Sequence, residues 1–340
     1  DMKKILCVGN ALVDRLFTNT ADEMLSAIGL ERGGMSLIDD ERSAWLADHT
    51  REMACEYATG GSSSNTALAL AHLKGQVGYV GMIGGDEVGA FYERTLREAG
   101  VKTHLLRDSK TVTGIANTFI SPDGERTFAT HLGAASLLGA DLISMELMEG
   151  YDLLYVEGYL LMNHELAKKI MRTADRLGME IALDLSSYNI VAADRDFFRQ
   201  ILADHVDIVF ANEQEALAFA FPDRPVADFS ADTADYDEQL DTAATILSRI
   251  CRTAVVKCGS KGSIYHHADE RGVCRENALP RSQVVDTTAA GDFFAAGFFS
   301  QYAVGADIDT CMRKAAEVAA EVIQVVGTRL SDETWARLAQ

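Results

Sequence analysis

The chain has 340 residues, 48% of them hydrophobic, and it carries a formal net charge of −20 at pH 7. This length allows one large α/β domain with an appendage, and the apolar content allows a substantial buried core. The acidic balance excludes a nucleic-acid-binding surface, which would need clustered Lys and Arg.

The cysteines and the hydropathy pattern restrict the class of protein further. Six cysteines are scattered without a CxxC pair, which argues against both a zinc site and a disulfide framework. No apolar stretch approaches the length of a transmembrane helix. We therefore expect a soluble, cytoplasmic protein with no membrane partner.

Short apolar runs that alternate with amphipathic stretches predict a parallel sheet with helices on both of its faces. The expected strands are residues 5–9, 78–83, 152–157, 180–185, 206–210 and 254–258. The clearest amphipathic stretch is 163–177, where Leu166 and Ile170 share one face. Asn163 can cap this helix, and Gly178 can end it.

Other stretches interrupt the alternation and predict a small second sheet. Residues 114–119 and 125–131 flank the turn sequence Ser121-Pro122-Asp123-Gly124, so we expect a β-hairpin there. Residues 14–17 and 35–38 are also strand-like. The expected organisation is a single domain, 1–340, with a lid formed by about residues 10–45 and 105–133.

The most informative stretch is Asp286-Thr287-Thr288-Ala289-Ala290-Gly291-Asp292, where small residues lead into a long apolar helix. The first turn of a helix presents free N–H groups and the positive end of the dipole, and small side chains let an anion approach closely. Asp292 in that turn could orient an acceptor hydroxyl beside the anion. A lone Asp292 would more simply be a helix-terminal carboxylate. The length of the run favours phosphoryl transfer instead.

This run resembles the second signature of the ribokinase family, also called the phosphofructokinase-B (PfkB) family, which usually reads Asp-Thr-Thr-Gly-Ala-Gly-Asp. Other family motifs are resembled by Gly60-Gly61-Ser62-Ser63-Ser64-Asn65, by Gly84-Gly85-Asp86-Glu87-Val88-Gly89 and by Asn212-Glu213-Gln214-Glu215. The opening Gly9-Asn10-Ala11-Leu12-Val13-Asp14 resembles the adenosine-kinase branch and its bacterial relatives. The resemblance covers nearly the whole chain. It implies a ribokinase-like α/β fold, with a doubly wound, mostly parallel sheet, helices on both faces and a small β-sheet lid.

The resemblance also implies a role for each matching residue. Asp292 would be the catalytic base, and Ala289, Ala290 and Gly291 would form the anion hole. The substrate contacts would be Asp14, Gly60, Gly61, Asn65, Arg126 and Tyr159. ATP would be held by Lys257, Gly259, Ser260 and Gly262. Asn212 and Glu215 would organise magnesium and phosphate, and Asp286 and Thr288 would bind a monovalent cation.

Several of these residues also have plain structural explanations. Asp14 alone would more often belong to a turn or a cap, and Asn212 and Glu215 have the spacing of a helix-capping pair. Tyr159, after the expected strand 152–157, would more often be a core residue. Ala289 stands where the family consensus has Gly, which we interpret as tuning of the loop and not as loss of activity.

The implied activity is that of an ATP-dependent kinase, working with Mg²⁺ and in some relatives K⁺, that phosphorylates a hydroxymethyl group of a small sugar or nucleoside. An adenosine-like nucleoside is favoured, because Asp14 could bind the ribose diol. Met35, Leu37 and Tyr159 would then offer an apolar slot for a purine.

Two alternatives remain open at this point. The acceptor could be a monosaccharide such as ribose or a fructose derivative, or the chain could be a non-catalytic sensor on the same fold. The intact Gly291 and Asp292 disfavour the sensor. A dinucleotide-binding Gly-x-Gly-x-x-Gly and a P-loop are both absent from the sequence. We expect a monomer or a homodimer.

Overall fold

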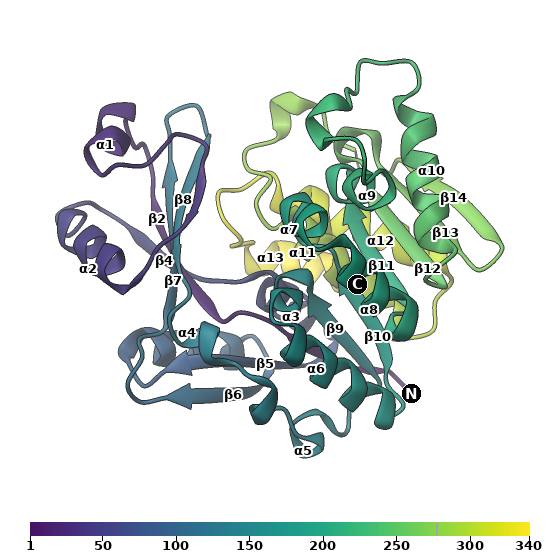
Figure 1. Ribbon diagram of the computed structural model, residues 1–340, viewed down its shortest axis with the longest axis horizontal. Coiled ribbons are helices and arrows are strands. Elements are labelled where there is room, and N and C mark those ends of the chain that lie inside the picture. Colours follow the sequence, from purple (N-terminus) through teal and green to yellow (C-terminus); the bar gives the residue numbers. More distant parts are fainter. Residues whose placement is uncertain (277) are drawn as a thin grey trace.

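Two β-sheets form the framework of the protein in this computed structural model, which describes residues 1–276 and 278–340 (Figure 1). Within these residues the larger sheet has the order β14-β13-β12-β11-β10-β9-β1-β5-β6, and β13 alone runs in the direction opposite to the other strands. Its strands are β1 (Lys4–Val8), β5 (Gln76–Gly84), β6 (Lys102–Asp108), β9 (Leu153–Glu157), β10 (Glu180–Asp184), β11 (Ile208–Asn212), β12 (Thr253–Lys257), β13 (Ser263–His267) and β14 (Glu270–Cys274). The predicted mostly parallel α/β sheet is thus confirmed.

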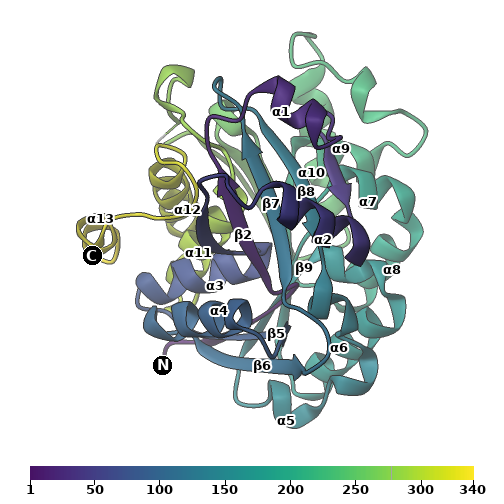
Figure 2. The same ribbon diagram turned by 90° about the vertical axis from the view of Figure 1, so that its left-hand side faces the viewer.

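Helices cover both faces of this sheet, as Figure 2 shows from the side. One face packs against α5 (Met145–Met148), α6 (His164–Arg176), α7 (Tyr188–Ala193), α8 (Arg195–His205), α9 (Glu213–Ala220) and α10 (Tyr236–Ser248). The other packs against α3 (Ser62–His72), α4 (Glu87–Glu98), α11 (Ala290–Tyr302), α12 (Ile308–Val322) and α13 (Asp332–Leu338). In the part of the chain that the structure describes, no helix combines the length and apolar character needed to cross a membrane.

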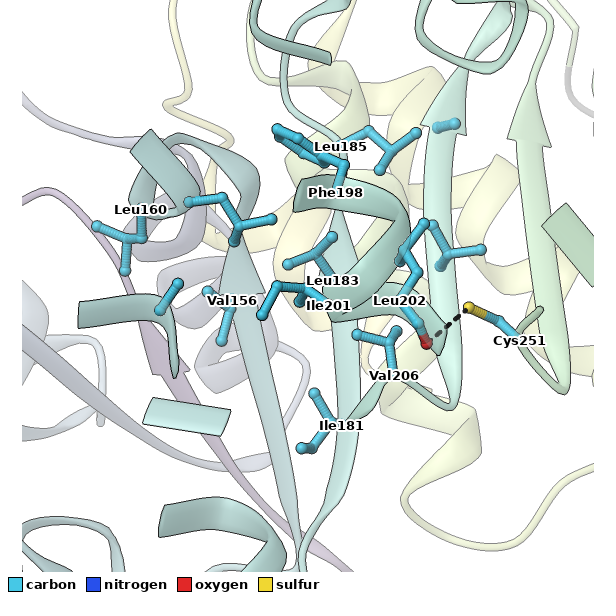
Figure 3. Close-up of a cluster of buried hydrophobic side chains, with 14 of the residues drawn as sticks. Val156, Leu160, Ile181, Leu183, Leu185, Phe198, Ile201, Leu202, Val206 and Cys251 are labelled. Atoms are coloured by element: carbon cyan, nitrogen blue, oxygen red, sulfur yellow. Dashed lines mark hydrogen bonds between the residues drawn. The ribbon is translucent and has the colours of Figure 1, made fainter. Parts of the chain in front are cut away.

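The core explains why short, wholly apolar runs became strands. Val156 of β9 and Leu183 of β10 lie in one buried cluster with Phe198 and Ile201 of α8 (Figure 3). Burying each such side chain contributes about 1.5–3 kcal/mol. A strand covered by helices on both faces needs apolar side chains at every position, and not the alternation of a half-exposed strand.

The second sheet has the order β3-β8-β7-β2-β4. Its strands are β2 (Leu12–Phe17), β3 (Met35–Leu37), β4 (Glu56–Gly60), β7 (Gly114–Ile120) and β8 (Arg126–His131). Helices α1 (Asp22–Ala27) and α2 (Asp40–His49) cover the face that points away from the large sheet (Figure 1). Phe17 and Phe119 stack beneath them, with ring centroids 4.7 Å apart. The predicted hairpin is confirmed, because β7 and β8 pair antiparallel.

The limits expected for this sheet need correction. Strand β4 pairs with β2, although its residues lay outside the expected ranges. Its sequence Glu-Tyr-Ala-Thr-Gly is short and half exposed, so it lacks the apolar pattern of the other strands. Residues 105–108, expected in the lid, instead end β6 at the edge of the large sheet, where they pair with β5.

Strand order places the site at β1. The chain runs from β1 outward to β5 and β6 on one side and to β9, β10, β11 and β12 on the other. Such a change of direction is a topological switch point, and open α/β sheets bind their ligands outside the carboxyl ends of the strands there.

Candidate active site

Four polar side chains stand at the carboxyl ends of neighbouring strands of the large sheet. Glu157 ends β9, Asp184 ends β10, Asn212 ends β11 and Lys257 ends β12. In the strand register Asp184 lies opposite Glu157, and Asn212 lies opposite Lys257. Because parallel strands all end at one edge, the sheet itself assembles this polar row beside the switch point.

Asp292 approaches this row from the first turn of α11 and is held by the start of α3. Ser62 Oγ donates to Asp292 Oδ1 at 2.7 Å, and Asn65 Nδ2 donates to Oδ2 at 3.0 Å. Burial raises the pKa of Asp292 to about 6, and the hydrogen bonds from Asn65 and Ser62 oppose that rise. A carboxylate fixed in this way, with a pKa near neutral pH, is suited to accept a proton.

Gly60 and Gly61 bring Asp14 toward the same place. A Cβ atom at Gly60 would collide with the Asp14 carboxylate, and one at Gly61, which has φ 87°, would collide with the Asn10 carbonyl. Glycine alone accommodates both the close approach and the left-handed backbone. Glycine is therefore required at both positions by the fold, which the neighbouring sequence does not show.

Three residues that sequence reasoning assigned to the site are brought together by the fold. Burial raises the pKa of Asp14 to about 7, while the charge of Arg126 lowers it and that of Asp292 raises it. The fold thus brings the charges of Arg126, from β8, and Asp292, from α11, close enough to Asp14, on β2, to change its pKa.

The loop before α11 contains the predicted anion hole. Ala289 is the N-cap residue and has a left-handed conformation, φ 61° and ψ 8°, which explains why the consensus residue is Gly. The N–H of Ala290 already donates to the Thr287 carbonyl at 3.2 Å. The N–H groups of Gly291 and Asp292 lie in the first turn, where they have no acceptor within the helix. They are the donors best placed for an anion.

Arg126 joins the small sheet to this loop through an ion pair with Asp286, and both side chains are largely buried. Asp286 also accepts hydrogen bonds of 2.9 Å from the N–H groups of Thr288 and Gly327. The carboxylate predicted to bind a monovalent cation is therefore occupied by a guanidinium. Arg126, predicted to meet the transferring phosphate, lies beside the anion-hole loop.

Asn212 and Glu215 form a capping box at the start of α9. The Asn212 side chain accepts the Glu215 N–H at 2.8 Å, and the Glu215 carboxylate accepts the Asn212 N–H at 2.8 Å. Burial raises the pKa of Glu215 to about 7, and the charge of Asp184 adds to the rise. Among the described residues, no group of three or more His, Cys, Asp or Glu side chains could hold a metal ion.

A cavity of about 970 Å³ lies over part of this site, although Asp14, Asn65 and Arg126 are not among the residues that line it. The residues that line it include Ser62, Asp184, Asn212, Glu215, Lys257, Asp292 and, in the strand-turn predicted to hold ATP, Gly259, Ser260 and Gly262. Gly262 has φ 88°, and a Cβ there would collide with the Cys274 carbonyl, so this turn also requires glycine.

The predicted apolar slot is divided between two parts of the molecule. Tyr159 borders the cavity and donates to the Ser186 carbonyl at 3.3 Å. Met35 and Leu37 do not line this cavity. They lie on β3, the edge strand of the small sheet, with side chains 69% and 74% exposed. In this arrangement the three residues do not line one cavity.

Sequence reasoning missed three residues at this site. Ser62 contacts the Asp292 carboxylate, Asp184 forms an ion pair with Lys257, and the buried Glu157 accepts the N–H groups of Asn10 and Ser63. Burial raises the pKa of Glu157 to about 7. A polar residue that ends an apolar strand was an available signal for Asp184 and Glu157. Nothing in three consecutive serines singles out Ser62.

An oriented carboxylate beside an open helix N-terminus, at the switch point of a parallel sheet, defines an enzyme that transfers a phosphoryl group to a hydroxyl. The sequence matches the pfkB family of carbohydrate kinases over residues 30–335, and the chain belongs to this family. It is therefore an ATP-dependent sugar or nucleoside kinase, a phosphotransferase with an alcohol group as acceptor.

Known structures and sequences agree with this assignment. The adenosine kinase from Sinorhizobium meliloti is 32% identical with a TM-score of 0.83, and the match covers 100% of both chains. A probable sugar kinase protein from Rhizobium etli CFN 42 is also 32% identical, with a TM-score of 0.81 over 96% of this chain and 95% of that one. The adenosine kinase of Saccharomyces cerevisiae is 28% identical over 342 residues, covering 97% of each chain. The ribokinase-like fold is thus confirmed.

Proposed function

We propose that this kinase phosphorylates the 5′-hydroxymethyl group of a purine ribonucleoside, with adenosine as the preferred acceptor and magnesium-bound ATP as the donor. The observation that carries the proposal is the position of Met35 and Leu37. Both are exposed apolar residues, and both share the uncovered face of the small sheet with Asp14.

Strand register establishes that shared face. Asp14 pairs with Ala116, Ala116 pairs with Thr130, and Thr130 pairs with Leu37. Paired residues of a sheet lie on one face, and three strand spacings amount to about 14 Å. A monosaccharide bound at Asp14 would leave Leu37 in water, whereas a nucleoside base extends from the ribose toward it.

The ribose would be bound by Asp14 and Asn65. An ionised Asp14 can accept hydrogen bonds from both hydroxyls of a vicinal diol. Asn65 donates one N–H to Asp292 and keeps a second N–H and its carbonyl oxygen for the sugar. Asn65 would thus hold the ribose in a fixed position relative to the Asp292 carboxylate, which receives the proton.

Asp292 would accept the proton of the 5′-hydroxyl at the carboxylate that Ser62 and Asn65 orient. The N–H groups at the start of α11 would stabilise the phosphoryl group, because they are fixed before the reaction starts and need no reorganisation. Closure of the small sheet would exclude water, which would otherwise compete as acceptor.

The donor set also suits magnesium. Mg²⁺ usually binds through one or two carboxylates, several waters and substrate phosphates. Glu215, with Asn212 beside it, provides one such carboxylate on the wall of the cavity, whereas Asp184 is already paired with Lys257. When bound, the ion would supply charge neutralisation for the phosphates.

The test is an ADP-release screen over adenosine, other nucleosides, ribose and fructose derivatives, with Mg²⁺ and ATP. We expect adenosine to be phosphorylated, 2′-deoxyadenosine to react more slowly, and Tyr159→Ala to raise KM more than it lowers kcat. Leu37→Ser should also raise KM for adenosine, while Val304→Ser, an exposed apolar residue outside the site, should not.

A monosaccharide acceptor is the second candidate, and the similar structure described as a probable sugar kinase favours it. Efficient turnover of a monosaccharide, together with none of any nucleoside, would decide for that candidate. Equal rates for adenosine and its 2′-deoxy analogue would separately remove the role of Asp14.

A further inference from the structure

Lys257 occupies an unusual position for a residue that ends a buried strand. Its Nζ lies 2.9 Å from Asp184 Oδ2, and its side chain is only 16% exposed. On its other side, a Cβ atom built at Gly291 would be 2.8 Å from the same nitrogen. The ammonium group therefore lies against the first turn of α11, beside the N–H groups that face the anion site.

The charges around the cavity make this ammonium group distinctive. Among the described residues that line it, Lys257 is the only Lys or Arg, whereas Asp184, Glu213, Glu215, Glu276 and Asp292 carry carboxyl groups. Although burial opposes its charge, the carboxylates of Asp184, Glu215 and Asp292 hold the pKa of Lys257 above its usual range. The group remains a cation throughout the neutral pH range.

A triphosphate entering this cavity meets mostly negative side chains. Phosphoryl transfer passes through a loose transition state whose charge is spread over three equatorial oxygens. A buried cation that is already in place stabilises such charge more strongly than the same cation would in water. Among the described residues of the cavity wall, Lys257 is the one side chain that can provide such a cation.

We propose that Lys257 is a further catalytic residue, whose ammonium group donates to an equatorial oxygen of the phosphoryl group during transfer, with Asp184 as its positioning residue. The bond between the γ-phosphorus and the bridging oxygen breaks, and a bond to the acceptor oxygen forms. The hydroxyl proton goes to Asp292, and Lys257 stays protonated. The inference rests on the proposed kinase function but on no particular acceptor.

A purely structural role would be to neutralise Asp184 within the fold. The two roles predict different results for a double variant. Lys257→Met leaves Asp184 buried without its partner, so it loses activity under either role. Lys257→Met combined with Asp184→Asn removes both charges and keeps a similar volume. A structural role predicts that activity returns in the double variant, whereas a catalytic role predicts that it does not.

The experiment compares wild type, both single variants and the double variant with whichever acceptor the wild type uses. We expect kcat to fall by about 10²–10³ in Lys257→Met and to stay low in the double variant. ADP binding should change less than tenfold, while binding of ADP with aluminium fluoride and acceptor should be lost. Lys3→Met, which removes the Lys3–Glu180 pair outside the cavity, is the control and should retain full activity.

Two results would overturn the proposal. One is a double variant within tenfold of the wild-type kcat. The other is a Lys257→Met variant in which only the KM for ATP changes and kcat is retained. If Lys257→Met does not fold, the double variant, which leaves no unpaired buried charge, decides by itself. Failure of the proposed acceptor would appear in the wild type, before any variant is compared.

Discussion

Ser62 Oγ donates a hydrogen bond of 2.7 Å to Asp292 Oδ1, although 230 positions separate the two residues in the sequence. Helix α3, which starts at Ser62, belongs to the first quarter of the chain, and α11, which carries Asp292, follows residue 289. The orientation of the carboxylate is thus decided by the packing of α3 against α11. This relationship has a measurable consequence for the pH dependence of the enzyme.

In the wild type, we expect kcat/KM to fall in two steps as the pH drops through about 7 and then through about 6. The pKa of Asp14, which would bind the diol as a carboxylate, is raised to about 7, and that of Asp292, which accepts a proton only as a carboxylate, is raised to about 6, so activity is present above both values and lost below them. Because the hydrogen bond from Ser62 favours the Asp292 carboxylate, Ser62→Ala should move the lower limb to higher pH, by about one unit. The measurement is kcat/KM between pH 5 and 9.

The matched control is Ser300→Ala, on the same helix as Asp292. Ser300 Oγ donates to the Gly297 carbonyl, so this change should leave the limb in place. A limb that does not move in Ser62→Ala, or moves to lower pH, would contradict the assigned hydrogen bond.

Asp292→Asn should lower kcat by about 10²–10⁴ while ATP binding survives, because the amide keeps the shape of the side chain but cannot accept the proton. The rate is measured by ADP release and the binding by titration calorimetry. An Asn variant that turned over within tenfold of the wild type would show that another group is the base.

Ala289→Gly should stabilise the protein modestly. The left-handed conformation of Ala289 costs about 1–2 kcal/mol, and the added freedom of Gly in the unfolded chain offsets about 0.4–1 kcal/mol of the gain. Ala290→Gly is the control: Ala290 begins the right-handed part of α11, so Gly there should destabilise by about 0.5–1 kcal/mol. Urea unfolding measures both, and the same sign for the two variants would contradict the argument.

Potassium should affect the rate through Asp286. The Arg126 guanidinium occupies this carboxylate, so we expect only a small gain in activity when potassium replaces a bulky organic cation. The ratio of the two rates should increase in Arg126→Met, which vacates the carboxylate, and should be one in Asp286→Ala. Equal ratios in the wild type and in Arg126→Met would exclude competition between the two cations.

The sequence was most informative where a local pattern had one structural solution. The apolar runs predicted the buried strands, and the segment from Asp286 to Asp292 predicted the helix start that faces the cavity. One family motif proved to be structural: Asp86 caps α4, accepting the N–H groups of Gly89 and Thr113 at 2.8 Å each.

Contacts between distant segments could not be predicted. The pairing of Arg126 with Asp286 joins positions 160 residues apart, and it depends on how the small sheet stands against α11. Strand β4 was missed because Glu56–Gly60 becomes a strand by pairing with β2, and its own composition gives no sign of this. Asn65 was assigned to the sugar alone, since sequence spacing carries no information about which way its amide points.

The row of polar residues at the ends of β9, β10, β11 and β12 separates the groups for phosphoryl transfer, on the large sheet, from residues of the small sheet. The separation of these groups is set by the strand spacing of about 4.8 Å, which substitutions elsewhere cannot easily alter. Met35 and Leu37, which would contact the base of the acceptor, lie by contrast on the small sheet, where they are exposed and contribute little to any core. Substitutions at these two positions should cost little folding stability. The acceptor can therefore change during evolution while the residues that transfer the phosphoryl group stay the same.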